Sequence, residues 1–299
     1  MRLFPKSSFD SFLLPFFGVF ASTRGYTILV LVAAQYLSAR YILAPQKTWI
    51  AHLTDPRLFL LVLASSFAIA GGYLINNFYD AEKDRINRPQ QYLLHQLVPP
   101  ERQLFFYAFF NLGCLIFAFL VSYKAVLFFS AYMMAIWFYS HLLKKMFWAS
   151  NVFAAVLAIT PFFAISLYFS NLSPWVLYHA SFLFLIILIR DLVKDLQNFK
   201  GDWVRNYSTV AVVFGVKTTK YILTVLMLLA SATVFLLLSE KEQLGKMFYY
   251  FVGTLPFLLG LMILLWCAEE QKTYLWLHNL LKFLILAGVG SIVLVRYTI

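Results

Sequence analysis

Long apolar runs separated by short polar gaps recur along the whole chain. A membrane-spanning helix needs about 20 mostly apolar residues, and nine segments of the sequence fit that requirement. Strands of a membrane barrel would instead alternate apolar and polar residues over about ten positions, and these runs do not. The pattern predicts an all-α polytopic membrane protein whose nine transmembrane helices form a bundle, with spans near residues 26–44, 58–78, 104–122, 125–143, 147–169, 174–189, 221–239, 248–268 and 274–295.

Two places in this pattern need comment. The sixth span is short because Arg190 ends its apolar run, and we expect its acidic end to continue the helix into space lined by protein. Residues 8–22 are apolar but interrupted by Pro15, and this run continues towards the first span without a convincing cleavage site, so residues 1–24 are expected to be an interfacial segment and not a cleaved signal peptide. We expect residues 1–299 to form a single transmembrane domain.

The composition excludes a soluble protein. Hydrophobic residues make up 62% of the chain and charged residues only 12%, against roughly half and about a quarter in soluble domains. The net charge of +11 does not indicate nucleic-acid binding, because Lys and Arg are scattered among the polar gaps. The two cysteines lie in apolar runs and are too few for a disulfide framework.

The positive charges predict the orientation in the membrane. Sixteen of the 24 Lys and Arg lie in the gaps on the side of the N-terminus, seven lie on the other side, and one lies within a span. Positively charged loops stay in the cytoplasm. We therefore expect the N-terminus and the basic gaps to be cytoplasmic, in the inner (plasma) membrane.

The placement of acidic residues is the strongest chemical signal. Asn76, Asp80 and Asp84 lie at the cytoplasmic end of the second span at i, i+4 and i+8, and Asp191 and Asp195 repeat the i, i+4 spacing at that of the sixth. Such residues share one face of a helix, where like charges repel. Mg²⁺ prefers carboxylate and amide oxygens and completes its shell with water and substrate phosphate. The pattern therefore predicts a magnesium site for a phosphate-bearing substrate.

Basic residues interleave with these acids and are candidates for binding a diphosphate. They are Arg85, Arg88, Lys144, Lys194 and Lys200. In the alternative interpretation the acids form ordinary ion pairs with neighbouring Lys and Arg at solvated helix ends. Two matching acidic segments, both ending a span on the same side, favour the metal site.

In this register the two acidic motifs resemble those of the UbiA superfamily of intramembrane prenyltransferases, over essentially the whole chain. Asn76, Asp80 and Asp84 match the first motif, and Asp191 and Asp195 the second. The resemblance implies helices around a central cavity, Mg²⁺ and a prenyl diphosphate held by the motifs, and transfer of the prenyl group to a lipophilic acceptor amid membrane lipid.

The segment from Arg190 to Asp202 looks closest to that of geranylgeranylglyceryl-phosphate prenyltransferases, which implies that acceptor. Some family members carry further acids here, whereas this chain has Gln197, Asn198 and Lys200, so a third carboxylate other than Asp202 is in doubt. An aromatic quinone precursor or a porphyrin stays open as the acceptor, and the prenyl chain length is also open.

Prenyl transfer is limited by breaking the bond between the allylic carbon and the diphosphate oxygen. Mg²⁺ and basic residues stabilise the departing diphosphate, and aromatic faces stabilise the allylic cation. We expect Asp80 and Asp191 to bind Mg²⁺ directly and Tyr139 to act on the cation, with Tyr79 as a second aromatic candidate.

A secondary transporter is the rival from another functional class. Transporters show inverted repeats, broken helices and acids near the midplane, whereas the acids here lie at the cytoplasmic ends of spans. The five histidines show no ligand spacing, so no zinc or heme site is predicted.

Overall fold

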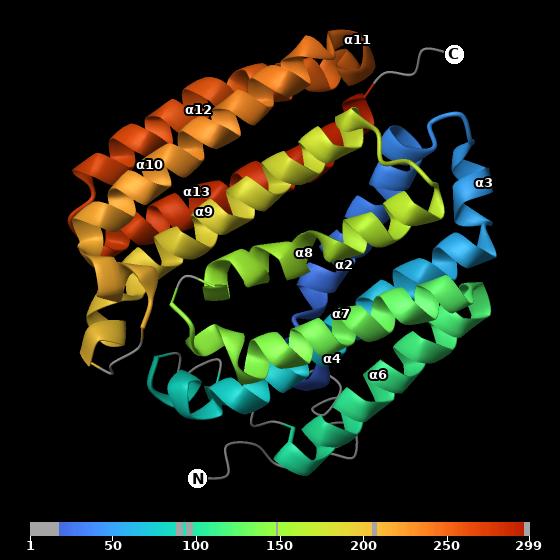
Figure 1. The fold of residues 1–299 in the computed structure, drawn as a ribbon, viewed down its shortest axis with the longest axis horizontal. Coiled ribbons are helices and arrows are strands. Elements are labelled where there is room, and N and C mark those ends of the chain that lie inside the picture. Colours follow the sequence, from blue (N-terminus) through green and yellow to red (C-terminus); the bar gives the residue numbers. More distant parts are fainter. Residues whose placement is uncertain (1–17, 88–91, 94–97, 148, 205–207, 296–299) are drawn as a thin grey trace, which may run out of the picture. The chain divides into compact units, whose positions relative to one another are not determined.

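The computed structural model describes residues 18–87, 92–93, 98–147, 149–204 and 208–295. Within these residues the chain is helical and contains no strand (Figure 1). The long helices are α2 (Gly25–Ser38), α4 (Pro56–Asn87), α6 (Pro100–Val121), α7 (Tyr123–His141), α8 (Ala149–Tyr168), α9 (Pro174–Val204), α10 (Val210–Ser239), α12 (Phe248–Cys267) and α13 (Gln271–Ser291). Shorter elements are a π-helical turn (Ala39–Leu43), α3 (Trp49–Leu53), α11 (Lys241–Leu244) and 3₁₀ turns at Leu143–Lys145, Gly245–Met247 and Ile292–Leu294.

Eight helices in the described part of the chain are long and apolar enough to cross a membrane. This confirms the all-helical membrane fold. The fourth expected span, 125–143, corresponds to α7, which has 19 residues but is not among the eight. Its tyrosines, tryptophan and serines lower its hydropathy, so the predicted count of nine is approximate.

The bounds of α9 and α10 test the predicted sixth and seventh spans. α9 continues without a break from Pro174 to Val204, as expected for the short sixth span. The seventh span was expected to begin at 221, but α10 begins at Val210. Gly215 interrupts it with φ +81°, a conformation that glycine adopts without strain. The lysines that follow Gly215 concealed this first part of the helix.

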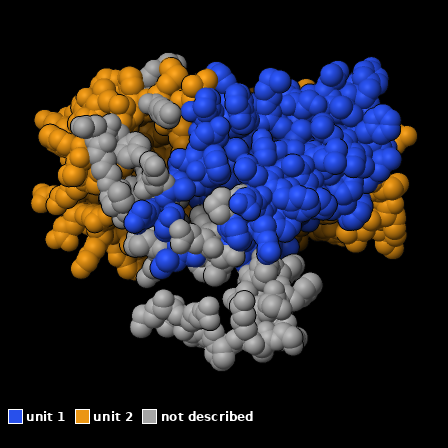
Figure 2. Space-filling view, turned by 90° about the horizontal axis from the view of Figure 1, so that it is seen from below, with its two compact units in different colours: residues 1–33, 59–141 blue, residues 34–58, 142–299 orange. Residues whose placement is uncertain are grey.

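The chain forms two compact units, coloured separately in Figure 2. Unit 1 contains residues 1–33 and 59–141, and unit 2 contains residues 34–58 and 142–299. Each unit is described by itself below. Of the expected interfacial segment 1–24, residues 1–17 lie outside the described residues.

In unit 1, small residues bring α4 close to α6 and α7. A Cβ added at Gly72 of α4 would lie 3.0 Å from Ile136 of α7, and one at Gly113 of α6 would lie 2.6 Å from Phe67. Glycine permits such close approach of helix backbones in membranes. Asn77 is buried and donates its Nδ2 to the Ser22 carbonyl, 2.8 Å away. These contacts fix the half of α4 that carries the first acidic motif.

In unit 2, α9 packs against α8, α10 and α13. Its buried apolar side chains run from Val176 through Ile186 and Ile189 to Val193 and Leu196. The last two lie beyond Asp191, so packing against neighbouring helices continues past the start of the second acidic motif. The helix is therefore held rigidly where its carboxylates emerge.

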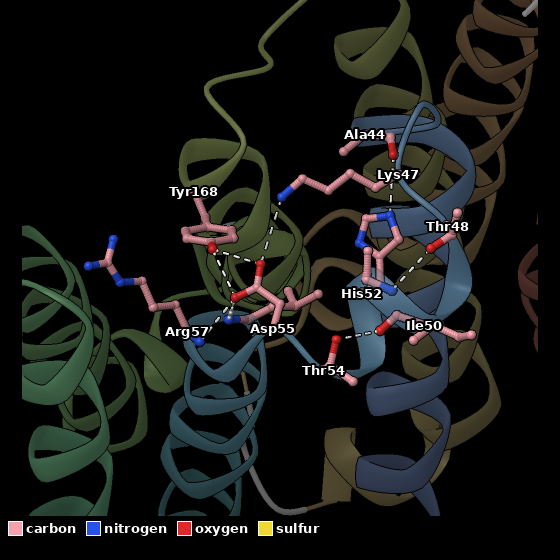
Figure 3. A network of polar contacts seen from close by, with 11 residues as sticks. Ala44, Lys47, Thr48, Ile50, His52, Thr54, Asp55, Arg57 and Tyr168 are labelled. Atoms are coloured by element: carbon pink, nitrogen blue, oxygen red, sulfur yellow. Dashed lines mark hydrogen bonds and ion pairs between the residues drawn. The ribbon is translucent and has the colours of Figure 1, made fainter.

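A polar network joins the start of α4 to the end of α8 within unit 2 (Figure 3). Asp55 accepts hydrogen bonds from the Arg57 and Leu58 backbone N–H groups at 3.1 and 3.2 Å, which caps α4. Its carboxylate also accepts the Tyr168 hydroxyl at 2.9 Å and lies 3.8 Å from Lys47 Nζ.

His52 of α3 lies beside this network and is fully buried. Its Nε2 donates to the Ala44 carbonyl at 3.2 Å. Burial lowers the pKa of His52, and the nearby charges of Lys47 and Arg40 lower it further. The neutral imidazole thus ties α3 to the end of the preceding π-helical turn.

Candidate functional site

The first acidic motif lies in the last turns of α4. Because α4 is continuous through Asn87, Asn76 and Asp80 lie one turn apart on the same face, as predicted. Both side chains are half-buried. The Ser140 hydroxyl of α7 lies 3.0 Å from Asn76 Oδ1 as a donor and 2.9 Å from the Ile136 carbonyl. A polar group on a neighbouring helix therefore positions Asn76.

The other expected residues of this motif are described less fully. The Asp84 side chain and the whole of Arg88 lie outside the described residues. Arg85 is exposed. These three residues keep their predicted roles as expectations only.

Aromatic rings from α4 and from the last turns of α7 lie close together. Tyr79 is 40% exposed, and its ring centroid lies 5.3 Å from that of His141, which stacks on Trp137 at 5.3 Å with an interplanar angle of 11°. Successive residues of an α-helix are about 100° apart around its axis. Tyr139, two residues before His141, therefore points about 200° around the axis of α7 from it, and its proposed contact with the cation stays a prediction.

The second acidic motif lies on α9, where Asp191 and Asp195 are one turn apart and half-buried. Arg190 donates to Asp191 Oδ1 from Nε at 3.2 Å and from Nη2 at 3.0 Å. Asn151 of α8 donates its Nδ2 to Asp195 Oδ2 at 2.7 Å. The contact of Arg190 with Asp191 is ion pairing of the kind that the alternative interpretation expected.

Three candidate lysines belong to the same unit as this motif. Lys194 is half-buried on α9 and lies near enough to Asp195 to act on its charge. Lys144 is half-buried on the turn Leu143–Lys145, which contacts α8. Lys200 is exposed, while Asp202, two residues later, is only 3% exposed.

Sequence reasoning did not nominate Ser140 and Asn151. Both are neutral polar residues near helix ends, where such side chains commonly bond to their own backbone. For Ser140 the sequence signal was its place in the Tyr-Ser-x-x-x-Lys stretch from Tyr139 to Lys144, which resembles the family, and for Asn151 it was only proximity to Lys144. Their partners on other helices become visible only in the fold.

The donor sets of both motifs suit Mg²⁺. Among the side chains that the structure describes, no three His, Cys, Asp or Glu residues lie close enough together to hold a metal by themselves. Mg²⁺ usually takes one or two carboxylates and completes its octahedron with water and substrate phosphate. Asn76 with Asp80, and Asp191 with Asp195, each supply oxygens of that kind. Bound phosphate would therefore complete the coordination.

Comparisons with known proteins agree with this reading. The model of the UbiA prenyltransferase family matches residues 28–286. A digeranylgeranylglyceryl phosphate synthase from Sulfurisphaera tokodaii is 26% identical over 246 residues, which cover 79% of this chain and 86% of that relative.

Solved structures share the fold. A structure concerning digeranylgeranylglyceryl phosphate synthase in membranes has a TM-score of 0.71 at 17% identity, covering 92% of this chain and 96% of its own. A UbiA homologue from Archaeoglobus fulgidus bound to GPP and Mg²⁺ has a TM-score of 0.66 at 14% identity, covering 92% and 99%.

Proposed function

Because this chain belongs to the UbiA prenyltransferase family, we propose that it transfers a prenyl group from a prenyl diphosphate to a lipophilic acceptor in the membrane, with Mg²⁺ as cofactor. The observation that carries the proposal is the pair of motifs, each with oxygen ligands one turn apart on a rigid helix. The solved homologue with GPP and Mg²⁺ bound supports the same substrate class.

We propose geranylgeranylglyceryl phosphate as the acceptor. The support comes from relatives named digeranylgeranylglyceryl phosphate synthase, at 26% and 28% identity over most of this chain. In this reaction the acceptor hydroxyl forms a bond to the prenyl carbon, the bond from that carbon to the diphosphate oxygen breaks, and diphosphate and a proton are released.

The proposed roles follow the chemistry of each side chain. Bound Mg²⁺ supplies positive charge to the leaving diphosphate. Basic residues add to this stabilisation, which gains strength in a water-poor site, and Tyr139 faces the allylic cation. The proposed Mg²⁺ ligands are Asn76, Asp80, Asp84, Asp191 and Asp195, and the proposed diphosphate-binding residues are Arg85, Arg88, Lys144, Lys194 and Lys200.

Two further expectations belong to this proposal. Residues 1–299 act as one catalytic domain, which is supported by a family match from 28 to 286 that includes residues of both units. The N-terminus and the loops beside both motifs are cytoplasmic, in the plasma membrane, which is supported by the asymmetry of Lys and Arg along the chain.

The test uses the purified chain with radiolabelled geranylgeranyl diphosphate and a panel of acceptors. We expect a Mg²⁺-dependent ether product with geranylgeranylglyceryl phosphate and none with a hydroxybenzoate. Asp80→Ala and Asp191→Ala each lower kcat about 100-fold or more, because charge stabilisation at the leaving group is lost.

The matched control is Glu242→Ala, which removes an exposed carboxylate of α11. Retained turnover in both aspartate variants would contradict the site. Product with the aromatic acceptor alone would replace the proposed acceptor. Gradient-driven uptake into vesicles without prenyl transfer would support the transporter instead.

A further inference from the structure

Asn151, in the first turn of α8, is a buried polar residue in contact with the second acidic motif. Its side chain is 8% exposed, and its Nδ2 lies 2.7 Å from Asp195 Oδ2. An ionised carboxylate only accepts hydrogen bonds, so the amide nitrogen must face Asp195. The Ser150 hydroxyl donates to Asn151 Oδ1 at 2.9 Å. The amide orientation is therefore determined by partners at both ends.

The segment that carries Asn151 also carries a basic candidate and packs on α10. Lys144 lies seven residues earlier, on the turn Leu143–Lys145 that contacts α8. Between them, the Phe147 ring lies 5.4 Å from the Phe214 ring of α10. One short stretch of chain thus connects Lys144, the start of α10 and the carboxylate of Asp195.

We propose that Asn151 is a positioning residue that holds one oxygen of Asp195 so that the carboxylate presents its other oxygen to Mg²⁺. The inference rests on the proposed function. Asp191 and Asp195 repel each other at i, i+4, and a hydrogen bond to an ionised acceptor is about twice as strong as a neutral one. The amide of Asn151 therefore opposes rotation of Asp195 away from the metal.

Because the Asn151 amide is neutral, it can orient Asp195 without neutralising its charge. A lysine or arginine in place of Asn151 would form an ion pair with Asp195 and compete with the cation. An amide donates a hydrogen bond and leaves the negative charge for Mg²⁺. Partners of this kind, which orient metal ligands without binding the metal, typically change metal affinity 10–100-fold when removed.

The test measures Mg²⁺ dependence in the full chain in detergent, by prenyl transfer and by binding of unreactive geranylgeranyl thiodiphosphate. Asn151→Ala raises the Mg²⁺ concentration at half-maximal activity about 10–100-fold, and saturating Mg²⁺ largely restores kcat. Asn151→Asp is nearly isosteric but replaces the donor by another carboxylate. It therefore raises the Mg²⁺ concentration at half-maximal activity more than Asn151→Ala does. Thr160→Ala is the control on α8, because its exposed hydroxyl donates within its own helix, to the Val156 carbonyl.

Ser150→Ala provides a second variant that leaves Asn151 in place. It removes the donor to Asn151 Oδ1 and shifts the Mg²⁺ midpoint in the same direction by a smaller factor. If the Asn151 variants do not fold, this variant decides. An unmoved Mg²⁺ midpoint in folded variants, or a loss of kcat without a change in midpoint, overturns the inference. If the unmodified chain itself shows no Mg²⁺-dependent binding of the thiodiphosphate, the proposed function fails instead.

Discussion

The side chain of Asn76 accepts a hydrogen bond from a hydroxyl on another helix. Ser140 Oγ lies 3.0 Å from Asn76 Oδ1 and 2.9 Å from the Ile136 carbonyl of its own helix. A serine hydroxyl has one proton, so these two acceptors share it. The hydrogen bond that Asn76 accepts from Ser140 is therefore weaker than the one that Asp195 accepts from the Asn151 amide.

Replacing this hydroxyl will have a modest effect on activity. A neutral hydrogen bond contributes about 1 kcal/mol net, which corresponds to roughly a fivefold change in an equilibrium constant. Ser140→Ala is expected to raise KM for the prenyl diphosphate, or the Mg²⁺ midpoint, by about that factor. Steady-state kinetics at several Mg²⁺ concentrations measure it, with Ser130→Ala, a half-buried serine in the middle of α7, as the control. A shift of neither quantity would show that Asn76 keeps its position without Ser140.

Residues of the two motifs could be predicted because the chain has only seven aspartates and five of them lie in two short segments at the ends of apolar helices. The i, i+4 spacing placed Asn76 with Asp80 and Asp191 with Asp195, and the continuous helices confirm both pairings. Asn151 could not be predicted in this way. A neutral amide near a helix start fits many local roles, and its partner depends on which helices are neighbours, a property that periodicity does not encode.

The carboxylate of Asp55 makes several contacts at the start of α4. Asp55 caps the helix through the Arg57 and Leu58 N–H groups, and it accepts the hydroxyl of Tyr168 from the end of α8 (Figure 3). Pro56 follows at the first helical position, where the missing N–H costs nothing. The cap and the link to α8 therefore depend on the same side chain.

Substitutions at Asp55 and Tyr168 distinguish the capping of α4 from the link to α8. Loss of an N-cap destabilises by about 0.5–2 kcal/mol, so Asp55→Ala is expected to lower the thermal unfolding temperature in detergent. Asp55→Asn keeps a capping oxygen and should lose less. Tyr168→Phe removes only the hydroxyl bond and is expected to fall between Asp55→Ala and the unmodified chain. Equal stability of Asp55→Ala and Asp55→Asn would rule out the capping role.

The sequence predicted the bounds of α9 well and those of α10 less well, because the start of α10 depends on packing. The apolar run predicted α9 correctly, including its acidic continuation. α10 begins earlier than predicted, at Val210, and one of the lysines after Gly215, Lys220, is buried rather than solvated. Its Nζ donates to the Ala268 carbonyl at 2.7 Å, at the end of α12, and the Tyr274 hydroxyl donates to the same carbonyl at 3.1 Å. The charge of Lys220, which suggested a helix boundary in the sequence, therefore caps the C-terminal end of α12.

At the scale of the whole molecule, composition and charge predicted more than any single residue. Few charges, long apolar runs and clustered aspartates indicated a helical membrane enzyme, and the family match over residues 28–286 confirms the family. The acceptor could not be derived in the same way, because its pocket depends on side chains brought together by packing. Its identity therefore remains a proposal supported by relatives.

Ligand binding gives a test that involves the whole fold. A ligand that binds only the folded state raises the free energy of unfolding by RT ln(1 + [L]/Kd), about 2.7 kcal/mol at 100 times Kd. Geranylgeranyl thiodiphosphate with Mg²⁺ should therefore raise the unfolding temperature of the detergent-solubilised chain, and the thiodiphosphate without Mg²⁺ should raise it far less. The double variant Asp80→Ala, Asp191→Ala should lose this increase, because it lacks a proposed ligand in each motif. NaCl at matched ionic strength controls for screening. An equal increase in the double variant would mean that the diphosphate binds away from both motifs, and the carboxylates would then need another explanation.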